Sequence, residues 1–250
     1  MIRLFTLIFL VAQSITVEAT DTVVGGLSSK NISINTTFTG SKILIFGSIK
    51  RNNTEKIIPS QIIIEVLGPK TNITIRKKKK IFGIWVNSNP TRIYDSPSFY
   101  SLLSTDKLEK ILNQAELKNT LIGKKQFFDE ENKGQSYIDA VNAKIRIKIN
   151  NGSYLFDNDP VVLKDETLFS AQVSLPANLM EGDYQAIIYL VQNEKVISSF
   201  SDVIKVRKIG IEKWLYKMAH EQSFLYGLFS IFLALFFGWI AQTLFRKFQK

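Results

Sequence analysis

The stretch PANLMEGDY, residues 176–184, decides the fold prediction. It places a polar, glycine-containing turn directly before Tyr184, between two segments that alternate apolar and polar residues over 168–175 and 184–192. A tyrosine at the entry of a strand, with its hydroxyl bonded back to the preceding turn, is typical of the corner of an immunoglobulin-like β-sandwich. We therefore expect two strands here, joined by a corner that Tyr184 anchors.

The segments around this corner carry the same kind of strand signal. Short runs that are apolar or alternate in polarity are bounded by turn-forming residues, and Gly68-Pro69 is a strong turn signal. The further predicted strands cover 31–37, 42–49, 61–67, 72–77, 81–86, 160–163 and 195–207. Short strands at this spacing predict a mainly β body, an immunoglobulin-like β-sandwich with helical insertions.

Two segments within the body have helical periodicity instead. Asp106 and Glu109 form a capping pair before apolar residues spaced for one buried face, which predicts a helix near 106–118. A second apolar stripe predicts a helix near 134–150. Both are expected to be insertions into the β body.

The amino-terminal residues 1–19 have the pattern of a signal peptide. Arg3 precedes a short apolar stretch, and Val17 and Ala19 supply the small residues that precede a cleavage site. The stretch is too short to cross a bilayer, so we expect cleavage after Ala19, with an uncleaved anchor as the alternative. Either form places the body, residues 20–207, outside the cytoplasm.

The carboxyl-terminal residues 224–245 predict one transmembrane helix. These 22 residues carry no charge, and at about 1.5 Å per residue they span a hydrocarbon core of about 30 Å. The segment before them, 208–223, has one apolar helical stripe and is expected to lie at the membrane surface. The signal peptide and the basic tail, 246–250, together predict a body outside and a carboxyl terminus in the cytoplasm.

Composition limits the chemistry that the chain can perform. Of 250 residues none is cysteine and one is histidine, which excludes a disulfide framework, thiolate metal sites and an ordinary histidine-based triad. With no phosphate-binding glycine loop and no acidic Ca²⁺ loop, the sequence predicts no enzyme, no cofactor and no metal. The net charge of +10 suits nucleic acid or an anionic membrane, but abundant lysine and asparagine also fit an AT-rich genome, and we expect no nucleic-acid partner.

Several motifs, taken in order, resemble one known family. They are Phe38 and Gly40 followed by LIFGSI at 44–49, GP at 68–69, GIWVN at 83–87, PSFY at 97–100, LFSAQVSLP at 168–176, GDY at 182–184 and LYGLF at 225–229. As a set they resemble the alphaproteobacterial putative transmembrane protein family over nearly the whole mature chain. The resemblance implies a bacterial inner-membrane protein with a periplasmic body, and it carries over no activity and no catalytic residue.

Two aromatic segments are candidates for a partner surface. Trp85 and Asn87 lie in GIWVN, and Phe99 and Tyr100 lie in PSFY. Aromatic residues are enriched in the binding hot spots of protein interfaces. Packing of Trp85 and Phe99 in the core is the alternative.

The basic run at 76–80, Arg-Lys-Lys-Lys-Lys, has two interpretations. The simpler one is a solvated strand end whose lysines discourage edge-to-edge pairing. Contact with anionic lipid headgroups or with an acidic partner is the functional alternative.

Small residues form a stripe on the predicted transmembrane helix. Ser230, Ala234 and Gly238 recur every four residues, which stacks them on one side and lets another helix approach closely. We expect this side to pack against a partner, with a simple anchor as the alternative.

The sequence thus predicts a non-enzymatic, single-pass protein of the bacterial inner membrane. Its periplasmic β-sandwich would serve as an accessory or assembly partner of another integral membrane protein, such as a transporter. The alternative is an envelope enzyme or ligand-binding receptor with a site that no motif reveals and an unknown small-molecule ligand.

Overall fold

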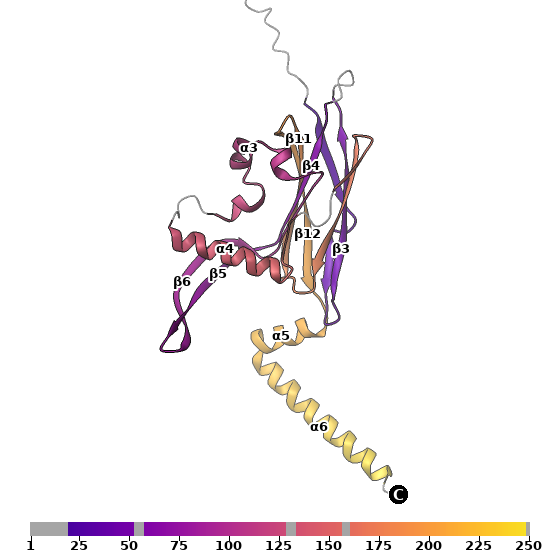
Figure 1. Ribbon diagram of the computed structural model, residues 1–250. Coiled ribbons are helices and arrows are strands. Elements are labelled where there is room, and N and C mark those ends of the chain that lie inside the picture. The colour runs from indigo at the N-terminus through magenta and orange to yellow at the C-terminus, as the bar shows by residue number, and fades with distance from the viewer. Residues whose placement is uncertain (1–19, 53–57, 129–133, 157–160, 249–250) are drawn as a thin grey trace, which may run out of the picture.

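The computed structural model describes residues 20–52, 58–128, 134–156 and 161–248. This part of the chain is mostly β-strand in several sheets, with helices on one side and a long helix at the carboxyl end (Figure 1). The predicted signal peptide, residues 1–19, lies outside the described residues.

A first sheet of four strands is antiparallel throughout. Its order is β1 (Thr22–Leu27), β3 (Gly40–Lys50), β10 (Leu168–Pro176) and β9 (Val162–Lys164). Burial alternates along β10, where Phe169, Ala171 and Val173 are buried and the residues between them are more exposed. One face of this sheet therefore lies in the core and the other faces solvent.

A second sheet of six strands contains both strand orientations. Its order is β2 (Asn31–Ile34), β12 (Lys195–Lys208), β11 (Gly182–Gln192), β4 (Gln61–Leu67), β7 (Tyr100–Ser104) and β8 (Tyr154–Phe156). β2 runs parallel to β12 and β8 runs parallel to β7, while the other pairs are antiparallel. A 2.8 Å bond from the Ile209 amide to the Ile34 carbonyl extends the β2–β12 pairing to the end of the body.

The two sheets share one hydrophobic core, and the second sheet also packs against helices on its other face. Ile62 and Ile64 of β4 belong to the core between the sheets, whereas Ile63 belongs to the core under the helices. A strand that is buried on both faces has a nearly continuous apolar sequence, which explains QIIIEVL at 61–67.

Tyr184 forms the predicted corner near the start of β11. Its hydroxyl donates a 2.9 Å hydrogen bond to the Met180 carbonyl, four residues earlier. The tyrosine ring is buried, and its centroid lies 5.9 Å from that of Phe99. The prediction of a tyrosine bonded back to the preceding turn is confirmed.

Helices inserted between β7 and β8 cover the outer face of the second sheet (Figure 1). They are α2 (Leu108–Ile111), α3 (Gln114–Asn119), the 3-10 helix η1 (Gly123–Phe127) and α4 (Gln135–Asn150). The prediction of one helix near 106–118 is wrong, because Leu112 is extended between α2 and α3, with φ −122° and ψ 138°. Asn113 begins a new helix there, since its side chain accepts a 2.8 Å bond from the Glu116 amide. α4 occupies the place of the second expected helix.

A long β-hairpin leaves the body between β4 and β7 (Figure 1). Its strands, β5 (Lys70–Ile81) and β6 (Ile84–Pro97), form a sheet of their own that is interrupted by two irregularities. The predicted strand at 81–86 is wrong, because the chain reverses within it at Phe82 and Gly83. Gly83 has a φ of +86°, a conformation that glycine adopts without steric cost.

Two helices follow β12 at the carboxyl end. α5 (Ile211–Glu221) begins after Gly210, and α6 (Ser223–Phe248) continues in a different direction after Gln222 (Figure 1). Among the described residues, one stretch, Ser223–Arg246, is long and apolar enough to cross a membrane, and its most apolar window is not buried against the rest of the chain.

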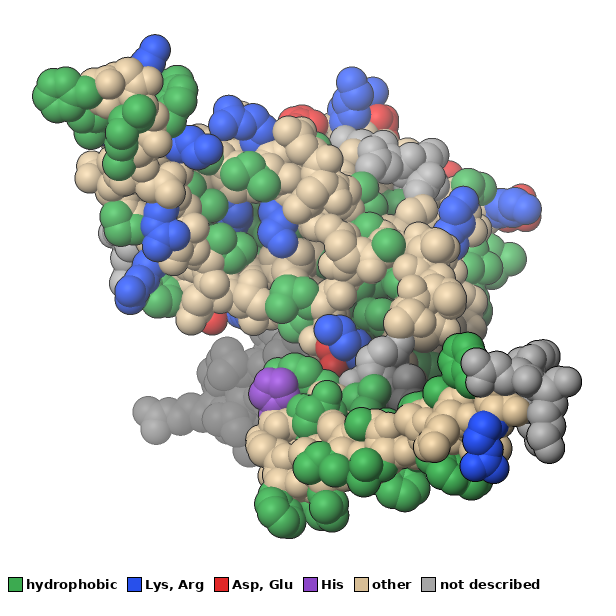
Figure 2. Space-filling view, turned by 90° about the horizontal axis from the view of Figure 1, so that it is seen from below, with side chains coloured by type: hydrophobic (Ala, Val, Ile, Leu, Met, Phe, Trp, Pro, Cys, Tyr) green, Lys and Arg blue, Asp and Glu red, His purple; other side chains and the backbone are tan. Residues whose placement is uncertain are grey.

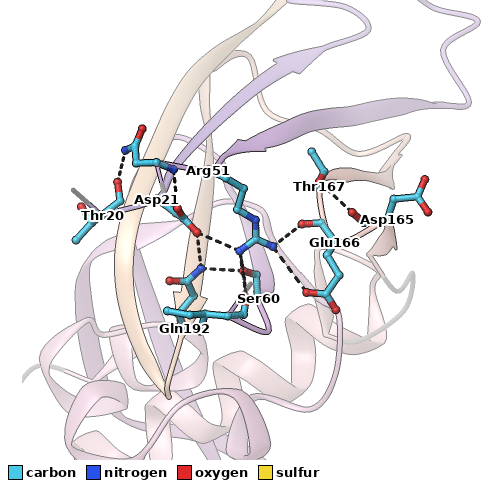
Figure 3. A network of polar contacts seen from close by, with 10 residues as sticks. Thr20, Asp21, Arg51, Ser60, Asp165, Glu166, Thr167 and Gln192 are labelled. Carbon is cyan, nitrogen blue, oxygen red and sulfur yellow. Dashed lines mark hydrogen bonds and ion pairs between the residues drawn. The ribbon is translucent and has the colours of Figure 1, made fainter. Parts of the chain in front are cut away.

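Arg51, directly after β3, is the centre of a polar network (Figure 3). Its Nη1 donates to Asp21 Oδ2 and to Ser60 Oγ, each at 3.0 Å. Its Nη2 donates to the Glu166 carbonyl at 2.6 Å. Gln192 Nε2 donates to Asp21 and to Ser60, each at 2.9 Å. The network therefore joins segments that are far apart in the sequence at one end of the two sheets.

Candidate membrane-facing site

α6 carries the predicted stripe of small residues on a surface that the described chain leaves open. Ser230, Ala234 and Gly238 stack on one side of the helix. A Cβ atom added at Gly238 would meet no atom within 4 Å. The Ser230 hydroxyl donates a 2.8 Å bond to the Tyr226 carbonyl, so it is satisfied within the helix. The stripe is a smooth surface that another helix is able to approach closely.

α5 folds back against the first part of α6. The rings of Trp214 and Phe229 meet edge to face, with centroids 5.7 Å apart and an interplanar angle of 90°. An apolar groove of about 670 Å³ lies between the helices, lined by Trp214, Met218, Leu225, Leu228, Phe229, Ile231, Phe232 and Leu235. A short helix that carries tryptophan and is bent onto an apolar span suits the headgroup layer of a bilayer.

The tip of the β5–β6 hairpin holds an aromatic residue in a strained conformation. Ile81 pairs with Ile84, so Phe82 and Gly83 form a two-residue turn. Both have positive φ, as a type I′ turn requires, but that turn prefers asparagine at the position where Phe82 has a φ of +46°. The Phe82 side chain is also fully exposed. Phe82 thus combines a backbone conformation that is unfavourable for its residue type with full exposure of an apolar ring.

Further exposed apolar side chains surround Phe82. Ile81, Ile84 and Trp85 are 46%, 66% and 67% exposed. Figure 2 shows hydrophobic side chains gathered at the projecting hairpin, with basic side chains beside them. Single exposed apolar residues are ordinary on protein surfaces, but a contiguous exposed group marks an interaction site. We call residues 81–86 the hairpin tip.

The part of the hairpin next to the tip is strongly basic. Residues 76–80, which we call the basic stem, lie on β5 and pair with residues 85–90 of β6. Between Lys70 and Tyr94 the chain has seven basic residues and no acidic residue. None of the five stem residues forms an ion pair with a described residue. The hairpin therefore presents an apolar end on a positively charged stem.

A groove of about 710 Å³ lies between the hairpin and α4. Basic side chains line it from both sides, with residues 76–79 on β5 and Arg146 on α4. Asp139 is the one acidic residue in its described lining. The groove is suited to an anionic group, because positive charge is present on both of its walls.

Sequence reasoning missed a buried carboxylate beneath the helices. Glu65 on β4 is 3% exposed. Its carboxylate accepts hydrogen bonds from four donors, which are the hydroxyls of Tyr100 and Tyr189, the Gly123 amide and the Gln126 side chain. Burial raises the pKa of the Glu65 carboxyl, and the four hydrogen bonds offset this rise in part. The signal in the sequence is a single charged residue inside the apolar run QIIIEVL.

Lys144 on α4 is a second buried charge that sequence reasoning missed. It is 2% exposed, and its Nζ has no hydrogen-bond partner within the described part of the chain. The amine lies 4.8 Å from the centre of the Phe127 ring, a distance at which a cation is attracted to an aromatic face. Burial, together with the neighbouring Lys148 charge, lowers the pKa of the Lys144 amine to about 8. Its periodic position on an amphipathic helix was the available signal, because it falls on the buried side with Val141 and Ile145.

Comparison with known families agrees with the long apolar helix. Residues 22–247 match the model of a family described as Putative transmembrane protein (Alph_Pro_TM). The chain belongs to this family. The match begins at β1 and reaches nearly to the end of α6, so the β body and the apolar helix belong to one family unit, and the resemblance read from the ordered motifs is confirmed. No curated protein matches the chain.

In this member of the putative transmembrane protein family, the residues predicted for one partner surface lie in different places. Trp85 and Asn87 are exposed on β6, near the hairpin tip. Phe99 and Tyr100 are 2% and 0% exposed, the first in the core between the sheets and the second in the core under the helices. The prediction that Phe99 and Tyr100 contribute to a surface is wrong, because packed layers cover this segment on both faces.

The described residues of this family member contain no group of three or more histidine, cysteine, aspartate or glutamate side chains that is placed to hold a metal. The hairpin, α5 and α6 project from the β body (Figure 1). All three lie toward one end of the β body (Figure 1).

Proposed function

We propose that the chain is a non-enzymatic accessory or assembly partner of another integral membrane protein, such as a transporter. In this proposal α6 crosses the bacterial inner membrane once, the β body lies in the periplasm and the carboxyl terminus lies in the cytoplasm. The observation that carries the proposal is the stripe of Ser230, Ala234 and Gly238 on a helix whose most apolar stretch is not buried against the rest of the described chain. A helix with such a side is suited to a partner helix in the bilayer.

The strand order supports an immunoglobulin-like sandwich as the architecture of the body. That fold places strands A, B, E and D in one sheet and strands C, F and G in the other. The order β1-β3-β10-β9 corresponds to A-B-E-D, and the order β12-β11-β4 corresponds to G-F-C. The corner formed by Tyr184 lies near the start of β11, the F position, as this fold requires. On this assignment the hairpin and the helices are insertions that follow strand C.

Charge and expected processing support the orientation. Arg246 and Lys247 follow the apolar stretch, and basic residues are retained on the cytoplasmic side of a span. The predicted signal peptide would carry the body across the membrane before α6 stops the transfer.

One side of α6 carries small residues and the opposite side carries bulky ones, which favours the first side for contact with a partner helix. At about 100° per residue, Phe232 and Phe236 lie opposite the stripe, and their rings stack with centroids 6.0 Å apart. Bulky phenylalanine side chains suit lipid, whereas small residues permit close contact between helix backbones. The partner is therefore expected on the side of Ala234 and Gly238.

Site-specific photocrosslinking in native membranes tests this proposal. A photoreactive residue in place of Ala234 should give one discrete crosslinked product that contains another integral membrane protein. The same residue in place of Phe236 is the matched control and should give no discrete protein product, because that side faces lipid. The combined change Ala234→Leu and Gly238→Leu should abolish recovery of the partner in detergent while membrane insertion is kept. Equal products from both positions, or no product from a correctly inserted chain, would contradict the proposal.

The basic groove between β5 and α4 supports a second candidate function, a receptor for an anionic ligand. Binding of short-chain polyphosphate to the full chain in detergent should be lost in Arg146→Gln, because Arg146 lines the groove. Arg92→Gln removes a charge from the same hairpin outside the groove lining and should leave binding unchanged. Equal loss in both variants would mean that only the net charge of the hairpin matters and would exclude a defined site.

A further inference from the structure

We propose that the hairpin tip is a second membrane contact, which enters the surface of the same bilayer that α6 crosses while the basic stem binds anionic lipid headgroups. This inference rests on the membrane span of α6 and not on the identity of any protein partner. The proposed binding partner of the hairpin is an anionic lipid surface, which accounts for both its exposed apolar residues and its positive charge.

The composition of the tip suits the boundary between lipid headgroups and acyl chains. Phe82 stands at the apex of the hairpin, and Ile81, Ile84 and Trp85 stand directly behind it. Tryptophan is enriched at membrane interfaces, where its ring spans the change from polar to apolar surroundings. Phenylalanine and isoleucine contribute apolar area that a shallow insertion removes from water.

The charge of the stem matches an anionic lipid surface and not an apolar protein groove. The stem residues follow one another on β5, and no acidic residue occurs along the hairpin before Asp95. Near an anionic leaflet each lysine favours the bound state by about fivefold, and this effect falls away within a Debye length of about 10 Å. The stem therefore contributes to membrane binding only when the tip touches the bilayer. Its charge and the apolar apex then act together in one membrane contact.

The body holds the hairpin in a fixed direction. Ile93, near the base of β6, is 1% exposed and packs in the core under the helices, and α4 contacts both strands. The hairpin extends toward the end of the body from which α5 and α6 leave (Figure 1). Because α6 tethers the body to the membrane, the tip has a high effective concentration at the bilayer surface, and a weak contact is enough to keep it there.

Fluorescence of Trp85 in the full chain tests this inference. The chain has three tryptophans, so Trp214→Phe with Trp239→Phe leaves Trp85 as the single reporter. We expect its emission to shift to shorter wavelength, and brominated lipids to quench it, in vesicles of phosphatidylcholine with phosphatidylglycerol. In phosphatidylcholine alone both effects should be weaker, and added salt should reduce them.

Two variants separate insertion from folding. Phe82→Asn removes the apical ring but creates Asn-Gly, the preferred type I′ turn, so the hairpin stays formed while quenching of Trp85 falls. Lys78→Gln with Lys80→Gln should lower the ratio of bound to free tip by roughly 25-fold, because two lysines are removed. Arg92→Gln with Lys70→Gln removes the same charge from the base of the hairpin and should have a smaller effect.

A companion sample with Trp85→Phe and Trp214→Phe keeps Trp239 as its single tryptophan and reports on α6 in the same vesicles. The hairpin proposal would be overturned if Trp239 is quenched in this sample while Trp85, in the first sample, stays exposed to water in both lipid mixtures. That result would leave the span intact. Protection of Trp85 in native membranes but not in anionic vesicles would also overturn the hairpin proposal, in favour of a protein partner. No quenching of Trp239 would refute the span itself, and with it both the hairpin proposal and the proposed function.

Discussion

Arg51 and Asp21 form an ion pair between the end of β3 and the start of β1, with 3.0 Å between Nη1 and Oδ2. Their side chains are 15% and 10% exposed, so both charges are largely removed from water. Burial raises the pKa of the Asp21 carboxyl, but hydrogen bonds from Asn52, Gln192 and Arg51 outweigh this effect and the net pKa is lowered. The pair is therefore a point at which loss of one partner leaves the other charge poorly solvated.

Arg51→Ala should lower the free energy of unfolding of the body by about 3 to 5 kcal/mol, because it leaves Asp21 buried without its cation. Chemical denaturation of the full chain in detergent, followed by circular dichroism, measures this. Arg207→Ala is the matched control, since the Arg207–Asp183 pair is 43% and 58% exposed and should contribute less than about 1 kcal/mol. The stability that Asp21 contributes is present above its ordinary pKa of 3.8 and is lost as the pH falls through the lower native value. Similar losses in both variants would show that the Arg51 network does not hold the sheet ends together.

Glu65→Gln should change the stability of the body by no more than about 1 kcal/mol at neutral pH. The amide oxygen keeps the three donors that now reach Oε1, from Tyr100, Gly123 and Gln126, and the amide nitrogen is placed to donate to the Tyr189 hydroxyl oxygen. Glu65→Leu leaves these donors without an acceptor and should cost about 3 kcal/mol or more.

The same variants have a pH signature. Because the native pKa of Glu65 is raised, its native state holds a proton more tightly than the unfolded state, and stability should fall as the pH rises from the ordinary value of 4.5 to the native value. The stability curve of Glu65→Gln should lack this slope. An unchanged slope in that variant would assign the pH dependence to another group.

Lys144→Met should stabilise the body by roughly 1 to 2 kcal/mol at neutral pH. It replaces a buried ammonium with an apolar side chain of similar length, at the loss of a cation–π contact with Phe127. Since burial lowers the native pKa of Lys144 to about 8 from 10.5, the wild-type chain should gain stability as the pH rises between these values, and the variant should not. Destabilisation by Met would mean that the ammonium has a partner outside the described residues.

Tyr184→Phe should cost about 1 kcal/mol, because it removes the hydroxyl that bonds to the Met180 carbonyl while the ring remains packed. Denaturation of the full chain in detergent measures the loss. Tyr94→Phe removes a hydroxyl from an exposed side chain and should have no measurable effect. An equally small effect at Tyr184 would show that the corner bond does not stabilise the sheet pairing.

Reporter insertions test the orientation of the chain. A reporter that is active only in the periplasm should be active when inserted after Ile209, in the link between β12 and α5, and silent when fused after Lys250. Insertion after Ile209 leaves both the body and α6 complete. The opposite activity pattern would place the body in the cytoplasm.

Strands with one solvent-exposed face could be predicted from the sequence, because apolar and polar residues alternate along them, as in β10. The division of the helix near 106–118 could not be predicted from periodicity, since Asn113 competes as a cap within an apolar stripe that continues across it. The length of the hairpin could not be predicted from the sequence, for a different reason. Its turn uses Phe82 where asparagine is preferred, so the local sequence resembles a strand and not a turn.

Exposure of the candidate residues depends on layers that are distant in the sequence. Trp85 and Phe99 have similar local surroundings of aromatic and polar residues, yet one stands on a projecting hairpin and the other is covered by the opposite sheet. The apolar helix and its stripe were accessible from the sequence, because a span needs only length, hydropathy and helical spacing.

The parallel pairing of β2 with β12 determines how the body resists mechanical load. A pull on α6 reaches the body at the end of β12, because the chain passes from this strand into α5 and α6 through a short link. β12 is hydrogen-bonded to β2 on one side and to β11 on the other, so a displacement of β12 along its own axis would strain both ladders at once. In the proposed membrane orientation, a load on α6 would therefore be shared with both neighbours of β12 in the second sheet.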